Sequence, residues 1–482
     1  MSSIKSNILL NGINTITSLI FPVITFPYAA RVLLPGGIGA INFLNSIIGY
    51  IVLLTSLGIP LYAVKEVAKY RDNKFERDKI TVEIVVLSTA FCLLGYIAVW
   101  LLAKYVPQIH KQATLFYILS ITILFTSIGV NWFYQGIEDF KFITIRAIVI
   151  RTFAAAALFI FVKSSSDLLI YGMIVVGSTV GNNFINFVHL RKHIDIEPIR
   201  IKELEIGRHI RPTLAIFVLN LIISLYIQLN SIMLGFISSD EQVGYFAAGT
   251  KITHIGLTLI SSIGTVLLPR CSHLLKIGDL KGFSRVINKS LSLTLALSLP
   301  MCLGLIVLAY PITLVFCGNE YLSSIPVLYL NAPVVVFISL TNLIGIQILY
   351  PMDKVRIVIL SVSGGAVANL SLNFILIPLY GATGAAVSTL IAEFTVLAIQ
   401  IICGRPYLPF KIRSLIRPTY IIASVIMAFT VYFTTMLLNA DWIKVLVGIL
   451  SGAIIYTIIL VCFKEPILLE LILMTKKRIN HV

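Results

Sequence analysis

Long apolar runs recur along the whole chain and are separated by short polar stretches. Most runs have about the 20 residues that an α-helix needs to cross the hydrocarbon core of a bilayer. The pattern therefore predicts an all-α, polytopic membrane protein with about 14 transmembrane helices. The runs lie at about 8–28, 38–62, 80–103, 113–134, 143–162, 168–189, 213–237, 245–268, 290–316, 325–349, 355–377, 383–403, 418–438 and 445–463.

The composition supports this class. Hydrophobic residues make up 58% of the 482 residues and charged residues only 12%, whereas a soluble domain usually has about a quarter charged residues. The loops are too short to hold a folded extramembrane domain. The six cysteines are scattered without a C-x-x-C pair, so we expect neither a disulfide framework nor a metal site. No cofactor is expected, and the first apolar run has the character of an uncleaved helix.

The net charge of +16 would suggest a nucleic-acid partner in a soluble protein, but here it reflects membrane topology. When the loops are assigned alternately to the two sides, one side holds 29 of the 37 Lys and Arg residues and the other holds five. Loops rich in Lys and Arg stay in the cytoplasm. We therefore expect a protein of the cell inner (cytoplasmic) membrane with both termini cytoplasmic, and no nucleic-acid partner.

A weak internal repeat relates the two halves of the chain. A shift of 206 residues places Asn14 on Asn220, and a shift of 205 places Gly39 on Gly244. Each half would hold an even number of helices, so the repeats would be parallel, related by an axis along the membrane normal. The predicted parts are an N-lobe of six helices at 1–190, a C-lobe of six at 191–403, and two C-terminal helices with a basic tail at 404–482.

Polar side chains follow one face of several predicted helices. In the eighth run, five of them are spaced 3, 4, 3 and 4 residues apart, which places them on one face of an α-helix. Such a stripe either joins neighbouring helices by hydrogen bonds or lines a water-filled cavity, because lipid cannot satisfy polar groups. The stripe consists of Lys251, His254, Thr258, Ser261 and Thr265; the cavity-lining residues expected on runs 1, 2 and 7 are Asn14, Ser18, Asn45, Ser46, Asn220 and Gln228.

Cations inside the apolar runs are the strongest functional candidates. A cationic side chain at the bilayer centre costs about 2.5–3.5 kcal/mol on insertion scales, so it usually serves a function. Arg31, Arg151 and Lys251 are predicted to line the cavity, whereas Arg146 lies nearer a helix end and is expected to snorkel to the interface. A cavity with more positive than negative charge suits an anionic substrate. Candidates for ion coupling are Glu393, Glu83 and His254.

No enzyme motif accompanies these features. The chain has neither a Walker A loop nor a G-x-S-x-G or H-E-x-x-H sequence. We therefore expect a transporter and not an enzyme, with no ATP hydrolysis by the chain itself.

Short motifs resemble those of a known family. They are Phe26-Pro-Tyr-Ala-Ala-Arg31, Pro35-Gly-Gly-Ile-Gly39, Trp132-Phe-Tyr-Gln-Gly136, Gln347-Ile-Leu-Tyr-Pro351 and Tyr380-Gly-Ala-Thr-Gly-Ala-Ala386. In order and spacing they resemble the Wzx-type (O-antigen and repeat-unit) polysaccharide flippases of the multidrug/oligosaccharidyl-lipid/polysaccharide superfamily.

The resemblance implies translocation of an undecaprenyl-pyrophosphate-linked oligosaccharide across the cytoplasmic membrane, by alternating access between the two lobes. The substrate would be the repeat unit of an O-antigen, capsule or exopolysaccharide. Arg31 and Lys251 match the positions of cavity arginines in the related lipid II flippases, with Lys in place of Arg at the second. Expected partners are the lipid-linked glycan, the bilayer and other polysaccharide assembly proteins. The alternative function is a cation-coupled small-molecule exporter of the same superfamily.

Overall fold

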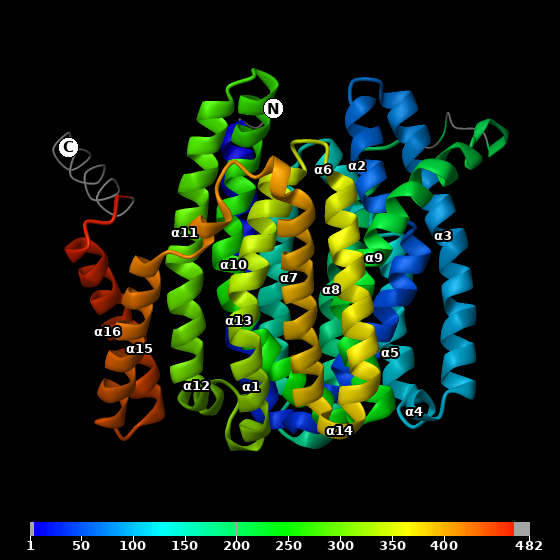
Figure 1. Cartoon of the computed structure of the whole chain (residues 1–482). Helices are drawn as coiled ribbons and strands as arrows, with labels where there is room; N and C mark the ends of the chain where they lie inside the picture. The colour runs from blue at the N-terminus through cyan, green and yellow to red at the C-terminus, as the bar shows by residue number, and fades with distance from the viewer. Residues whose placement is uncertain (1–3, 196, 198–200, 467–482) are drawn as a thin grey trace. The chain divides into compact units, whose positions relative to one another are not determined.

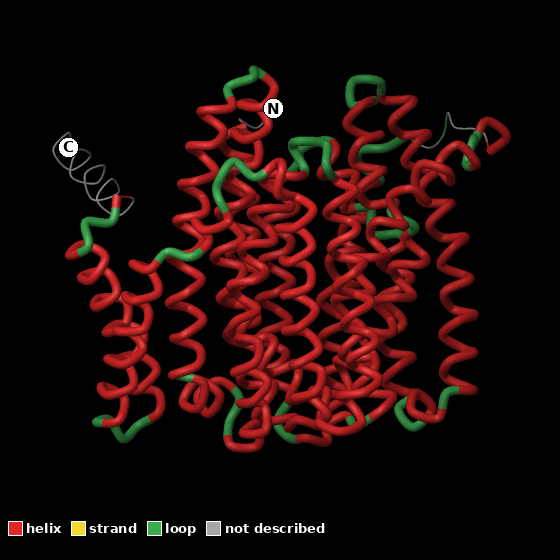
Figure 2. Tube along the Cα trace, viewed as in Figure 1, coloured by secondary structure: helices red, strands yellow, loops and turns green. Residues whose placement is uncertain are grey.

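The computed structural model describes residues 4–195, 197 and 201–466 of the chain. These residues form helices joined by short loops, and no β-strand occurs among them (Figure 2). The all-α prediction is confirmed. The chain divides into two compact units, residues 1–244 and 245–482. The predicted lobe boundaries at 190 and 403 stay a prediction.

The first unit is built from nine α-helices, and a tenth begins in it. The elements are α1 (Ile4–Ser56), α2 (Ile59–Lys69), α3 (Lys74–Tyr105), α4 (Pro107–His110), α5 (Ala113–Ser127), α6 (Asn131–Gly136), α7 (Phe140–Phe161), η1 (Ser165–Asp167), α8 (Leu168–Leu190), η2 (Ile201–Glu203), α9 (Gly207–Ile237) and the start of α10 (Asp240–Lys276).

Helix α1 contains two membrane crossings. Leu34 adopts a left-handed φ of 62° with an extended ψ of 171°, so the helix direction changes there. Pro35 follows at once, and a proline has no N–H to continue the preceding helix. The second crossing ends at Ser56, six residues before the predicted run ends, because Gly58 has a φ of 73° and Pro60 starts the separate helix α2.

The second unit has the same all-helical character. After the rest of α10 it contains α11 (Leu280–Val307), α12 (Ala309–Phe316), η3 (Asn319–Ser324), α13 (Ile325–Asn342), the π-helix η4 (Leu343–Leu349), α14 (Val355–Gly404), η5 (Arg405–Tyr407), η6 (Ile412–Leu415), α15 (Pro418–Met436) and α16 (Asp441–Cys462). Gly381, with a φ of 53°, divides α14 into two crossings. Helices α15 and α16 run side by side (Figure 1).

The number of crossings agrees with the sequence. Ten stretches of the described residues are long and apolar enough to span a membrane. Two of them hold two crossings each: Gly12–Lys69 contains those of α1, and Val355–Tyr407 contains those of α14. With α9 and α10 the described part of the chain matches the predicted total of about 14.

The outer surface is that of a protein covered by lipid. On α3, Leu93, Leu94, Ile97 and Trp100 are all more than half exposed. Soluble proteins rarely expose so many large apolar side chains on one helix face. Nearer its start, the same helix buries Asp78 and Glu83. The membrane-protein prediction is therefore supported by the distribution of exposed residues as well as by helix length.

Backbones meet closely where the second crossing of α1 and helix α10 begin. A Cβ on Gly39 would overlap the backbone carbonyl of Asp240, and a Cβ on Gly244 would overlap that of Pro35. Only glycine permits such an approach. Gly39 and Gly244 are the pair that the internal repeat superimposes, so equivalent positions of the proposed duplication lie against each other.

Candidate functional site: two intramembrane arginines on helix α7

Helix α7 carries two arginines that point to different neighbours. Arg151 faces α1, where its Nη1 donates to the backbone carbonyl of Asn14 at 3.2 Å, to Asn14 Oδ1 at 3.1 Å and to Thr17 Oγ1 at 3.0 Å. All three contacts use one guanidinium nitrogen. The side chain is half-buried, so its other guanidinium nitrogens can contact a ligand beside it.

Arg146 faces the opposite way, toward α6 and α8. Its Nε donates to Asn182 Oδ1 at 3.1 Å and its Nη2 to Asn131 Oδ1 at 3.1 Å. The side chain is only 8% exposed. The expectation that Arg146 snorkels to the interface is therefore wrong. Two asparagine amides hold Nε and Nη2 inside the protein, whereas Nη1 has no hydrogen-bond partner among the described residues.

Neither arginine is neutralised by an acid. Among the described residues, no carboxylate lies within ion-pair distance of Arg146 or Arg151, and all their partners are neutral oxygens. Neutral dipoles hold a cation in place without cancelling its charge. The space around helix α7 thus keeps positive charge.

The other predicted residues of α1 are placed by local bonds. Ser18 donates to the carbonyl of Thr15 at 2.7 Å and Ser46 to that of Asn42 at 2.8 Å, which satisfies both hydroxyls within the helix. Asn45 is half-buried and Arg31 is exposed. These residues carry polarity along α1, but the structure does not bring Arg31 into the Arg151 cluster through any bond described.

The seventh predicted helix contributes Gln228. Its amide lies directly against Gly49 of α1, because a Cβ at Gly49 would overlap the Gln228 side chain. Helices α1 and α9 pack together along their length, as the shared polar stripe suggested. The side chain of Asn220 lies outside the described residues.

The stripe on α10 belongs to the second unit. Lys251 and His254 are exposed, and Thr258 donates to the carbonyl of His254 at 2.8 Å. Ser261 accepts a hydrogen bond from Asn342 of α13 at 3.3 Å. The inner end of the stripe thus joins two helices, while Lys251 and His254 remain accessible. That Lys251, Arg31 and Arg151 share one cavity stays a prediction.

Glu83 has a different environment from the one expected of a lone titratable acid. It is fully buried and accepts hydrogen bonds from Arg208 at 2.6 Å, from His209 at 2.8 Å and from the backbone N–H of Glu205 at 2.7 Å. Tyr62 of α2 contacts the other ring nitrogen of His209 at 2.8 Å. This Glu83 cluster ties α2 and α3 to the start of α9. Glu393 is buried in α14, at 6% exposure, and the ion-coupling roles of both acids stay predictions.

Sequence reasoning missed the amide shell around Arg146 and the partners of Glu83. Asn131 and Asn182 each lie in or beside an apolar run, and polar amides there signal a buried partner. Arg208 and His209 lie in a basic stretch that was assigned wholly to membrane topology. Glu83, a carboxylate within an apolar run, indicated that some of those basic residues pair with a buried acid.

The model of the family described as "Polysaccharide biosynthesis protein" matches residues 4–275, more than half of the chain. The "Putative O-antigen transporter" of Escherichia coli (strain K12) is 26% identical over 407 residues, which cover 84% of this chain and 97% of that protein.

Solved structures share the fold. "Lipid II flippase MurJ, inward closed conformation" aligns with a TM-score of 0.78 at 18% identity, covering 95% of this chain and 98% of that one. An inward-facing multidrug resistance MATE family transporter of the MOP superfamily aligns with a TM-score of 0.64 at 12% identity, covering 83% and 98%. Family match, relatives and fold agree with the resemblance in the motifs, and the chain belongs to the polysaccharide biosynthesis protein family.

Proposed function

We propose that this protein is a flippase, which moves an oligosaccharide linked to undecaprenyl pyrophosphate from the cytoplasmic to the outer face of the cell inner membrane. The glycan would be the repeat unit of an O-antigen, capsule or exopolysaccharide. The family membership and the O-antigen transporter of similar sequence support this substrate class. Alternating access between two lobes is the mechanism that the related fold suggests.

The observation that carries the proposal is the uncompensated charge on α7. Arg151 is held by oxygens of Asn14 and Thr17, so it remains a cation within the membrane-spanning bundle. A pyrophosphate is a compact dianion whose usual partners are Arg and Lys. Binding it would offset the cost of keeping Arg151 charged in the bilayer. Arg31 and Lys251 are proposed to supply further positive charge along the substrate's path.

The polar residues of α1 and α10 suit the rest of such a substrate. A glycan presents many hydroxyl groups, which exchange hydrogen bonds with Asn, Ser and Thr side chains and with ordered water. A polyprenyl tail needs only apolar surroundings. A transporter can therefore enclose the head of the substrate in a polar cavity while the tail stays in lipid.

Orientation and partners are part of the proposal. The side rich in Lys and Arg would face the cytoplasm, with both termini there. The substrate would be received from the enzymes that assemble lipid-linked repeat units and passed to those that polymerise or ligate them outside.

The test is deletion of the gene followed by analysis of lipid-linked glycans and surface polysaccharide. Loss of surface glycan with repeat units trapped on undecaprenyl carriers in the inner leaflet is the expected result. Complementation with Arg31→Gln, Arg151→Gln and Lys251→Gln then tests the proposed cations. Lys104→Gln is the matched control, because Lys104 is an exposed cation stacked on Trp100 and Tyr105.

Two outcomes would count against the proposal. Unchanged surface glycan and no accumulated intermediate in the deletion strain would reject the flippase function. Raised drug sensitivity in the same strain would instead favour the cation-coupled exporter, with Glu393 as the next residue to replace. If all three Gln variants complement as well as Lys104→Gln does, the function stands and the assignment of the cations is wrong.

A further inference from the structure

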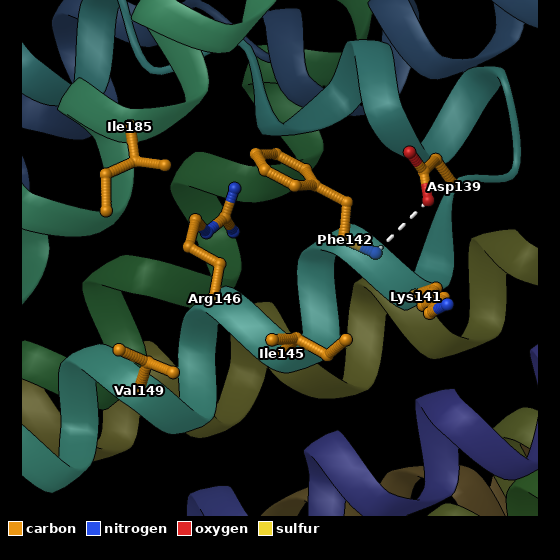
Figure 3. Close-up of a pocket in the computed structure, with 7 residues that line it drawn as sticks. All are labelled: Asp139, Lys141, Phe142, Ile145, Arg146, Val149 and Ile185. Carbon is orange, nitrogen blue, oxygen red and sulfur yellow. Dashed lines mark hydrogen bonds between the residues drawn. The ribbon is translucent and has the colours of Figure 1, made fainter.

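A cleft of about 410 Å³ lies between α7 and α8. It is a groove open on one side and not an enclosed cavity. Figure 3 shows the arrangement: α7 supplies most of the wall, and Ile185 of α8 faces it from the other side. The lining residues are Asp139, Lys141, Phe142, Ile145, Arg146, Val149 and Ile185.

The two ends of the cleft differ in chemistry. Asp139 and Lys141 stand at the beginning of α7, and Arg146 lies about 7.5 Å farther along the helix axis at the usual 1.5 Å rise per residue. Ile145, Val149 and Ile185 form the remainder. A ligand that fits this sequence of surfaces has a charged head at the start of α7 and an apolar chain directed along the helix.

Arg146 has a donor that the protein leaves unused. Its Nε and Nη2 bond to the two asparagines, but its Nη1 is buried without any hydrogen-bond partner. The Phe142 ring lies over the guanidinium, with its centroid 5.3 Å from Cζ. A buried donor of a charged group without a partner is costly. An acceptor oxygen brought in by a ligand would satisfy it when the Phe142 ring turns aside.

The net charge of the polar end favours an anion. Lys141 is exposed and Arg146 is a buried cation, against a single carboxylate. Asp139 already uses one oxygen, Oδ1, to accept the backbone N–H of Phe142 at 3.1 Å and so caps the helix. Two cations and one acid leave a positive balance at this end of the cleft, beside the first turns of α7.

Exposed apolar residues lie both in the cleft and beside it on the same two helices. On α7, Ile145, Val149 and Phe153 are 51%, 44% and 70% exposed. On α8, Phe184 and Val188 are 52% and 48% exposed. A water-filled passage would be lined by polar groups, whereas a surface of this kind is covered by lipid chains.

We propose that this cleft binds an anionic glycerophospholipid of the leaflet next to the start of α7. The phosphate would contact Lys141 Nζ and then Arg146 Nη1, and one acyl chain would lie over Ile145, Val149 and Ile185. The inference is independent of the proposed function, because it concerns a bilayer lipid and not the transported glycan. Such a lipid would be a structural lipid that fills the groove between α7 and α8.

The experiment is native mass spectrometry of the purified full-length protein, titrated with dioleoylphosphatidylglycerol or dioleoylphosphatidylcholine. The two lipids have the same tails, so a difference between them reports the headgroup. We expect tighter binding of the anionic lipid, and a loss of about fivefold with Lys141→Gln, since one basic residue near a membrane surface is worth about 1 kcal/mol. Lys65→Gln is the control, since Lys65 is an exposed lysine of the same unit outside the cleft.

A second variant tests the chain-binding part. Ile145→Trp fills the cleft from an exposed position, so the fold should survive, and it should weaken the binding of both lipids. Equal affinity of the wild-type protein for the two lipids would overturn the proposal. So would equal anionic-lipid affinity in Lys141→Gln and Lys65→Gln, or displacement of the phospholipid by a lower concentration of undecaprenyl phosphate, which would identify a polyprenyl lipid as the occupant.

Discussion

Arg151 on α7 donates one nitrogen to both carbonyl oxygens of Asn14 on α1, the backbone oxygen at 3.2 Å and the side-chain oxygen at 3.1 Å. The bond joins a helix of the fifth crossing to the first. It therefore combines two roles that experiments can separate. It positions the cation, and it braces α1 at a point two turns before Pro22, the first proline of the helix.

Separating charge from geometry at this pair gives the first prediction. Asn14→Ala removes the side-chain oxygen but leaves the cation and the backbone acceptor, so surface glycan should stay near the wild-type level. Arg151→Gln removes the charge and should lower surface glycan by about tenfold, if the loss of about 1.4 kcal/mol in substrate binding limits transport. Arg151→Lys should fall between them, since Lys keeps the charge but has no planar fork. Surface polysaccharide is compared at equal protein abundance; a loss in Asn14→Ala as large as in Arg151→Gln would make the role structural.

The amides around Arg146 give the second prediction. Arg146→Leu leaves Asn131 and Asn182 without their donor, so the free energy of unfolding should fall by about 1–3 kcal/mol. Asn182→Leu should cost less, because Asn131 still accepts from Nη2. The double variant should be less unstable than the sum of the two, with a coupling of at least about 0.5 kcal/mol. Thermal unfolding in detergent measures all three; simple additivity would show that the pair contributes nothing.

The third prediction concerns the Glu83 cluster. Glu83→Gln removes the charge between Arg208 and His209 and leaves Arg208 with only the weaker contact to Glu205 at 3.9 Å. Glu83 is fully buried but the Arg208 side chain is 34% exposed, so we expect the weakened hydrogen bonds to cost about 1–3 kcal/mol. We expect a lower thermal midpoint and faster proteolysis before α9. Asp72→Asn is the control, because Asp72 is an exposed carboxylate just before the same helix.

The fourth prediction is a pH dependence of stability. Burial lowers the pKa of His193 below 6.5, and His189 and Arg77 add to the effect while Asp139 opposes it. The folded protein therefore binds fewer protons at this site than the unfolded chain. The free energy of unfolding should decrease as the pH falls through the unfolded pKa, and the decrease ends below the folded pKa.

His193→Gln removes this contribution. Its thermal midpoint should fall less than that of the wild-type protein between about pH 7.5 and pH 5.5. His110→Gln serves as the control, because His110 is exposed. Identical pH profiles for the wild-type protein and His193→Gln would contradict the prediction.

The length of the apolar runs predicted the membrane class and the approximate positions of the crossings, because bilayer thickness imposes a length on every helix. It did not predict that α1 would continue to Leu34 before turning. Arg31 suggested a loop at residues 29–34, yet its neighbours Ala29, Ala30 and Leu33 are buried. The turn at Leu34 depends on tertiary packing as well as on Pro35, and packing has no local sequence signal.

The candidate site was predicted less completely. Arg151 stood out because a cation in the middle of an apolar run is rare. The structure places it half-buried against Asn14 and Thr17, and its role in the site stays a prediction. Arg146 was misjudged because distance from a helix end does not reveal partners on other helices. Asn131 and Asn182 are 51 residues apart in the sequence, so only the fold shows that both contact one guanidinium.

The contact between Gly39 and Gly244 has a consequence for how this end of the protein can open. Two backbones in van der Waals contact have no long side chains that could stretch across a widening gap. Dispersion attraction falls off within about an ångström of separation, so the contact is either made or lost. The opening of this end would then be a two-state change, with little stability in any intermediate position.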